Sequence, residues 1–71
     1  MKARTTSQVT NKIKCQHLSL YKGEGYWYFV YDDVEKRIFE TESVPVKYLS
    51  SMDVEEWVRI GQDFVNEIEN S

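Results

Sequence analysis

Cysteine and histidine are almost absent from this sequence, which has one of each among its 71 residues. Because Cys15 is the only cysteine, no intrachain disulfide can form, and a lone thiol fits a reducing compartment. A structural zinc site needs about four ligands, so Cys15 and His17 cannot complete one. We therefore expect neither a disulfide nor a structural metal to stabilise the fold.

Long apolar runs are also missing from the chain. No segment approaches the ~20 apolar residues that a membrane-spanning helix requires. Residues 1–14 lack the apolar stretch of a secretory signal peptide. We therefore expect a cytoplasmic protein that has no membrane partner.

Signatures of catalysis are sparse. Cys15 and His17 would share one strand face, as a nucleophile and its base can, but no turn, third group or oxyanion donor accompanies them. Glu40 and Glu42 would also share a strand face, an arrangement that is common on solvated sheets. Residues 23–25, Gly-Glu-Gly, lack the third glycine and the strand–helix context of a phosphate loop. We predict a protein with no enzymatic activity, no cofactor and no bound metal.

Positive charge is scarce in the second part of the chain. The net charge is −3, yet residues 1–23 hold five basic residues and no acidic one. Residues 24–71 hold four basic and twelve acidic residues, a net charge of −8. This asymmetry indicates a basic arm for an anionic partner, an acidic surface for a basic partner, or a solvated surface.

The polar N-terminus predicts a flexible arm over residues 1–11, because it shows no hydrophobic periodicity. Residues 12–71 then form a single domain. A chain this short buries only ~60% of the surface that its unfolded form exposes. The domain must therefore be well packed or associate with itself.

The clearest strand is residues 26–31, Tyr-Trp-Tyr-Phe-Val-Tyr, since aromatic and β-branched side chains suit a pleated surface. The two glycines of residues 22–25 predict a hairpin turn before it. The preceding strand lies within residues 13–21, with either a bulge near Gln16 or a start at His17. Alternation separates one face, Trp27, Phe29 and Tyr31, from the other, Tyr26, Tyr28 and Val30.

A third strand is predicted over residues 37–43, after a charged turn at 32–36. Phe39 is expected to face the helix described below, and Ile38 the opposite side. Residues 44–49 contain Pro45, so they form either an edge strand or a crossover loop, and a fourth strand stays open.

Residues 53–69 predict an amphipathic helix. Asp53 with Glu56 three residues later matches a capping box, and apolar residues then recur at three- and four-residue steps. Gly61, which costs about 1 kcal/mol relative to alanine in a helix, is expected to permit close approach to a Trp or Tyr ring. The residues expected to be buried against the sheet are Trp57, Phe64 and Val65.

These elements predict the fold class α+β: a three-stranded antiparallel sheet, with a fourth strand open, and one C-terminal helix on one face. Ten aromatic residues supply 14% of the chain, and the helix is expected to leave one aromatic sheet face uncovered. The candidate interaction residues on that face are Tyr26, Tyr28 and Val30.

An uncovered aromatic face has three interpretations. It can pack against a partner protein or a second copy, where tyrosine is a favoured anchor, or it can be covered by the N-terminal arm. It can instead stack unpaired bases, which needs nearby cations. The cations available for that nucleic-acid alternative are Lys12, Lys14 and Lys22. A further alternative uses the acidic segment to inhibit a nucleic-acid-binding protein.

Three runs resemble segments of small phage- and prophage-encoded proteins of unknown function. They are Gly-Glu-Gly-Tyr-Trp-Tyr-Phe-Val-Tyr-Asp at 23–32, Phe-Glu-Thr-Glu-Ser-Val at 39–44 and Met-Asp-Val-Glu-Glu-Trp-Val at 52–58. The resemblance covers residues 20 to about 65. It implies a mobile-element origin and an accessory role, and it brings no catalytic residues.

Overall fold

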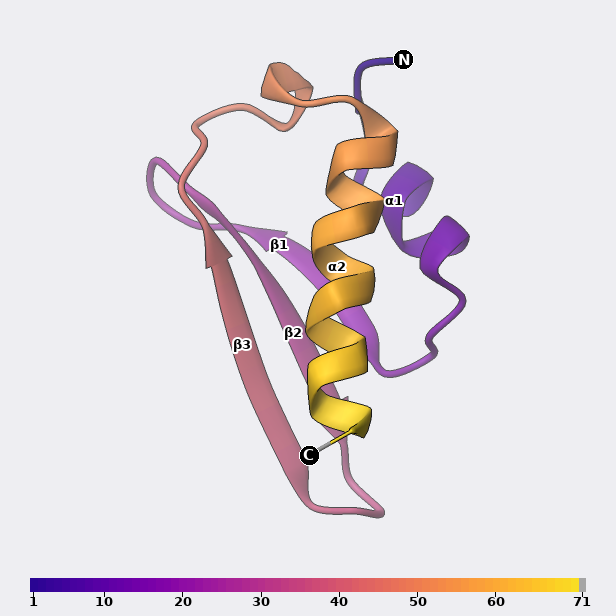
Figure 1. The fold of residues 1–71 in the computed structure, drawn as a ribbon. Helices are drawn as coiled ribbons and strands as arrows, with labels where there is room; N and C mark the ends of the chain where they lie inside the picture. Colours follow the sequence, from indigo (N-terminus) through magenta and orange to yellow (C-terminus); the bar gives the residue numbers. More distant parts are fainter. Residues whose placement is uncertain (71) are drawn as a thin grey trace.

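Three antiparallel strands form one sheet in the order β1-β2-β3 in the computed structural model, which describes residues 1–70. The elements in chain order are α1 (Thr6–Ile13), β1 (Leu18–Lys22), β2 (Trp27–Asp33), β3 (Ile38–Val44), the 3-10 turn η1 (Leu49–Ser51) and α2 (Val54–Glu69). Both α-helices lie on the same side of the sheet, with α1 beside α2 (Figure 1). The predicted α+β class and the C-terminal helix on one sheet face are confirmed.

Residues 44–49, left open as a fourth strand, do not form one. The sheet has three strands within residues 1–70, and the chain leaves β3 after Val44 through a loop to η1. Pro45 has no backbone N–H to donate to a neighbouring strand, which favours the crossover loop.

The N-terminal segment differs from the flexible arm that the sequence predicts for residues 1–11. Thr6–Ile13 form the helix α1. Thr5 caps it reciprocally with Gln8: the Gln8 N–H donates to Thr5 Oγ1 (3.4 Å), and the Thr5 N–H donates to Gln8 Oε1 (3.1 Å). Val9 and Ile13, one helical turn apart, are both buried. Two features of the sequence indicate this helix: the Thr-x-x-Gln capping box and the apolar pair one helical turn apart. Both are short and lie in an otherwise polar segment, which explains why the helix was not predicted.

The register of β3 corrects a second expectation. Phe39 pairs with Asp32, which points away from the helices, and Ile38 pairs with the buried Asp33. Phe39 is therefore 66% exposed, whereas Ile38 packs against the core. The hairpin loop at 34–37 sets this register, and a shift of one residue exchanges the two faces of a strand.

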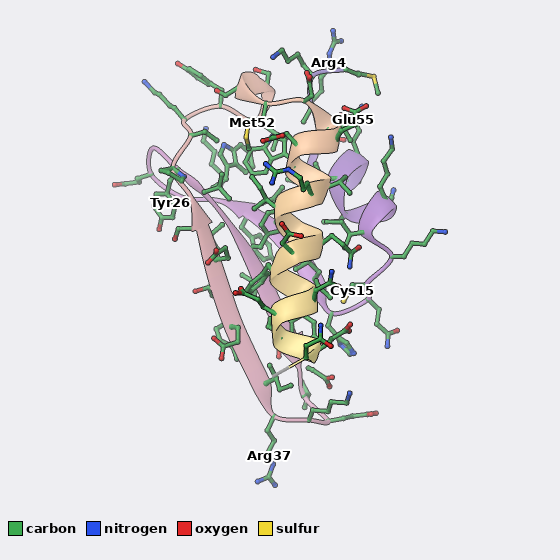
Figure 2. All side chains as sticks on the ribbon, viewed as in Figure 1. Arg4, Cys15, Tyr26, Arg37, Met52 and Glu55 are labelled. Carbon is green, nitrogen blue, oxygen red and sulfur yellow. The ribbon has the colours of Figure 1, made fainter. Side chains whose placement is uncertain are left out.

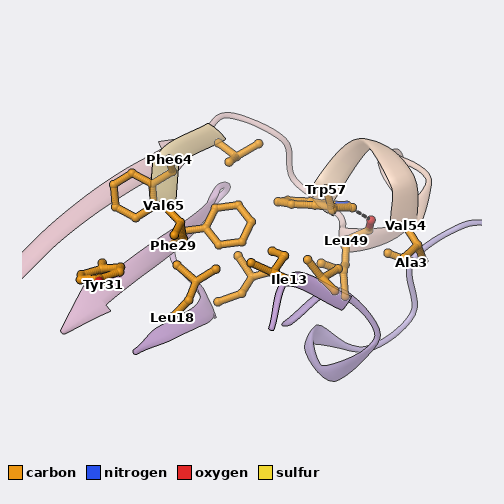
Figure 3. Close-up of a cluster of buried hydrophobic side chains, with 13 residues drawn as sticks. Ala3, Ile13, Leu18, Phe29, Tyr31, Leu49, Val54, Trp57, Phe64 and Val65 are labelled. Carbon is orange, nitrogen blue, oxygen red and sulfur yellow. Dashed lines mark hydrogen bonds between the residues drawn. The ribbon is translucent and has the colours of Figure 1, made fainter. Parts of the chain in front are cut away.

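The core lies between the sheet and the two helices (Figure 3). Trp57, Phe64 and Val65 are buried, as predicted. The rings of Phe29 and Trp57 meet edge to face, with 6.1 Å between their centres. These contacts join α2 to β2.

Gly61 permits a close approach, as expected, although the neighbouring ring belongs to a phenylalanine. A Cβ at Gly61 would lie 2.9 Å from Phe29 Cε1 and 2.5 Å from Ile13 Cδ1. Real Cβ atoms essentially never come so close to other heavy atoms. Gly61 thus lets α2 contact β2 and α1 at the same point.

The start of α2 differs from the predicted capping box. Asp53 is the N-cap residue, but its side chain makes no capping hydrogen bond. Asp53 Oδ1 lies 3.7 Å from Lys2 Nζ, and the Val54 N–H donates to the backbone carbonyl of Met1 (2.8 Å). The N-terminal segment therefore supplies a backbone acceptor for this helix start, since the first amides of a helix lack partners within it.

Candidate interaction surface

The side of the sheet away from α1 and α2 carries no helix (Figure 1), and we call it the outer sheet face. Leu18, Leu20 and Phe29 point into the core, so the residues that alternate with them point outward. Cross-strand pairing then places matching residues of the three strands on this face. Its residues are Ser19, Tyr21, Tyr28, Val30, Asp32, Phe39, Thr41 and Ser43, with Tyr26 beside them in the β1–β2 turn.

Three tyrosines form a cluster at the turn end of the outer sheet face. The Tyr28 ring lies between its neighbours, 5.8 Å from the centre of the Tyr21 ring and 5.9 Å from that of Tyr26. Tyr21 is 50% exposed and Tyr26 is 39% exposed, while Tyr28 is half-buried. Figure 2 shows Tyr26 at the end of the sheet where β1 turns into β2. The cluster is an aromatic surface that has no helix over it.

The β1–β2 turn holds Tyr26 in place. Gly23 donates its N–H to the Tyr26 carbonyl (2.8 Å), and Gly25 has a φ of +78° that favours glycine. A Cβ at Gly23 would lie 2.4 Å from Tyr26 Cζ, so the ring folds over this glycine. The two glycines that predicted a hairpin therefore also position the aromatic cluster.

The structure brings the three candidate interaction residues together. Tyr26, Tyr28 and Val30 share the outer sheet face, and Val30 is half-buried. Their role in binding stays a prediction. Sequence reasoning missed Phe39, because only the register of β3 places it on this face.

The three lysines of the nucleic-acid alternative do not reach this face. Lys22 pairs with Trp27, whose ring packs toward Trp57 on the helix side. Lys12 belongs to α1 and Lys14 is its C-cap, also on the helix side (Figure 1). Within residues 1–70, the strands present one charged side chain on the outer sheet face, Asp32.

Cys15 and His17 precede β1 and are not part of the outer sheet face. His17 Nε2 is 3.5 Å from Oδ2 of the buried Asp33, a partner that sequence reasoning missed. Asp33 Oδ1 accepts a hydrogen bond from the Lys36 N–H (3.2 Å), so this carboxylate holds the 34–37 turn. Cys15 is half-buried between α1 and β1 (Figure 2), and no hydrogen bond joins it to His17 in the described part of the chain. The contacts support a structural role for His17 and Asp33.

Glu40 and Glu42 share a strand face, as predicted, and that face is the helix side at the sheet edge. Across residues 1–70, no three Cys, His, Asp or Glu side chains are grouped closely enough to bind a metal ion. Neither α-helix among these residues has the length and apolar character to cross a membrane.

Comparisons of the chain with protein-family models, curated proteins and solved structures find no match.

Proposed function

We propose that the protein is a non-enzymatic interaction module that packs its outer sheet face against another protein. The single observation that carries this proposal is the uncovered cluster of Tyr21, Tyr26 and Tyr28, extended by Val30 and Phe39. Tyrosine supplies a large contact area at a low entropic cost and is enriched among the residues that dominate binding energy. The resemblance to phage and prophage proteins fits an accessory role of this kind.

The charge of the outer sheet face favours a protein over a nucleic acid. Binding to nucleic acid depends on Lys and Arg that neutralise phosphates. The face presents Asp32, and the lysines at 12, 14 and 22 lie on the helix side. The base-stacking alternative therefore has aromatic rings without cations beside them.

A second copy of the chain is the partner that we propose. A two-fold dimer brings the same patch of each copy together, so a charged patch would repel itself. The outer sheet face is nearly uncharged and avoids this repulsion. Sheets pack face to face about 10 Å apart, and a small domain gains stability from the additional burial.

Sedimentation over a wide concentration range tests this proposal. The wild type should dimerise, and a Tyr26→Ser, Tyr28→Ser protein should be monomeric while remaining folded by circular dichroism. The matched control is Tyr48→Ser, which removes an exposed tyrosine (59%) from the loop before η1 and should leave the dimer intact.

Two results would contradict the dimer. One is a wild type that stays monomeric at the highest concentration. The other is equal loss of association in the Tyr48→Ser control. Binding of a single-stranded oligonucleotide that weakens steeply with salt, and that is lost when Lys12, Lys14 and Lys22 become Gln, would instead favour the nucleic-acid alternative.

A further inference from the structure

A second surface lies on the helix side of the sheet, between β3 and α2. The helices lie nearer to β1 and β2 than to β3 (Figure 1), and the middle of the helix side of β3 is exposed at Glu40 and Glu42, between the buried Val44 and the partly buried Ile38. Two adjoining hollows of about 690 and 360 Å³ follow this line and share Glu42, Phe64 and Glu67. We call them together the β3–α2 groove.

The lining of the β3–α2 groove combines apolar and acidic side chains. The apolar residues are the less exposed ones and form its floor. They are Ile38, Ile60, Phe64 and Ile68. The carboxylates are exposed above them: Glu40, Glu42, Asp63 and Glu67. No lysine or arginine lines the groove among residues 1–70.

The groove runs along an unpaired sheet edge. β3 is one of the two edge strands of the sheet, and an edge strand presents backbone N–H and C=O groups to any chain that lies beside it. Glu40 and Glu42 point to the groove side of that edge. Among the described residues, neither they nor Glu67 take part in an ion pair.

We propose that the β3–α2 groove binds an extended basic segment of a partner protein, which adds a strand to β3. Strand addition gives affinity through the backbone, and alternate side chains give specificity. Because every second side chain of the added strand would face the groove, Lys or Arg at alternating positions would meet Glu40 and Glu42. Their aliphatic stems would cover the partly buried Ile38, Ile60 and Ile68 while the charged ends reach the carboxylates.

This proposal is independent of the outer sheet face, because the two surfaces lie on opposite sides of the sheet. The probe is a capped synthetic peptide of alternating lysine and threonine. Its first control alternates glutamate and threonine, and its second carries N-methyl groups that block one edge of its backbone. Binding is followed by amide chemical shifts of the full-length protein.

The expected result is saturable binding of the lysine peptide, with the largest shifts at Glu40, Thr41 and Glu42. Glu40→Gln with Glu42→Gln should weaken it about tenfold, since two opposite-charge pairs are lost. Glu24→Gln with Glu35→Gln removes the same net charge from exposed turn positions and should have a much smaller effect. The Tyr26→Ser, Tyr28→Ser protein should bind the peptide as the wild type does, whether or not the wild type dimerises.

Several outcomes would overturn the proposal. Absence of binding would refute the groove as a site for a basic segment. Equal weakening by the two Glu→Gln pairs would show that the peptide is attracted by the net charge of the protein and not by Glu40 and Glu42. Equal affinity for the N-methylated peptide would exclude strand addition. Shifts centred on Tyr26 and Tyr28 would assign the peptide to the outer sheet face. Self-association that only Glu40→Gln with Glu42→Gln abolishes would assign the groove to a second copy.

Discussion

Trp57 is fully buried, and its indole Nε1 donates a hydrogen bond of 2.8 Å to the backbone carbonyl of Leu49. The ring also packs edge to face against Phe29 and Trp27. One side chain thus joins α2 to β2 and to the 3-10 turn before α2. Its contacts lie in the middle of the core (Figure 3).

We expect Trp57→Ala to lower the free energy of unfolding by roughly 3–5 kcal/mol, as large aromatic deletions in a core do. Chemical denaturation measures this loss, and a domain of this size then has little stability left. Trp57→Phe keeps most of the ring but leaves the buried Leu49 carbonyl unpaired, at a cost of about 1–3 kcal/mol. An unchanged denaturation midpoint for Trp57→Ala would contradict this view of the core.

Tyr31 is a second residue whose environment has a measurable consequence. Burial raises its pKa above the ordinary value of 10.0, and the negative charges of Cys15, Glu69 and Asp33 act in the same direction. The folded state holds the phenolic proton more tightly than the unfolded state. The contribution of this pKa difference to the free energy of unfolding is therefore fully present below pH ~10 and is lost as the pH rises above that value.

We therefore expect the free energy of unfolding, measured by chemical denaturation at a series of pH values, to decline above pH ~10. Tyr31→Phe should flatten this decline. Tyr21→Phe, at a half-exposed position, serves as the control and should leave the decline in place. A decline of equal steepness in both variants would show that Tyr31 is not its cause.

At the scale of elements, α1 is joined to the rest of the fold at Gly61. Ile13 from α1 and Phe29 from β2 both reach the space that a Cβ at Gly61 would occupy. The three elements therefore cross at one point, and the volume available there is small.

Gly61→Ala should destabilise the protein by about 1–3 kcal/mol, because overpacking outweighs the ~1 kcal/mol gained in helix propensity. Ile13→Val removes the Cδ1 atom that lies 2.5 Å from the new methyl group. The double variant should therefore lose less stability than the two single variants together. Strict additivity, or a stabilised Gly61→Ala protein, would mean that α1 does not pack here.

At the scale of the whole molecule, both helices cover the same side of a three-stranded sheet. The outer sheet face with its tyrosine cluster is therefore not covered by a helix, and the β3–α2 groove runs along one edge of the sheet.

If the wild type dimerises through the outer sheet face, its melting temperature should rise with protein concentration, because association stabilises only the folded form. The Tyr26→Ser, Tyr28→Ser protein should show no such dependence.

The sequence by itself determined the elements that depend on local signals. Alternation in residues 26–31 predicted β2 and the separation of Phe29 from Tyr28, and the apolar period of residues 53–69 predicted α2 with Trp57 inside. The paired glycines predicted the β1–β2 turn. These patterns suffice because strand and helix periods depend on neighbouring residues alone.

Only the tertiary structure decided features that depend on contacts across the chain. The helix α1 is too short to be stable by itself, so its formation depends on packing against α2 and β1. The register of β3, set by one hairpin loop, moved Phe39 outward and placed Glu40 and Glu42 at the groove. The Asp53 side chain makes no capping hydrogen bond and instead lies beside Lys2 of the N-terminal segment. Such outcomes depend on which distant residues meet, and sequence periodicity carries no information about that.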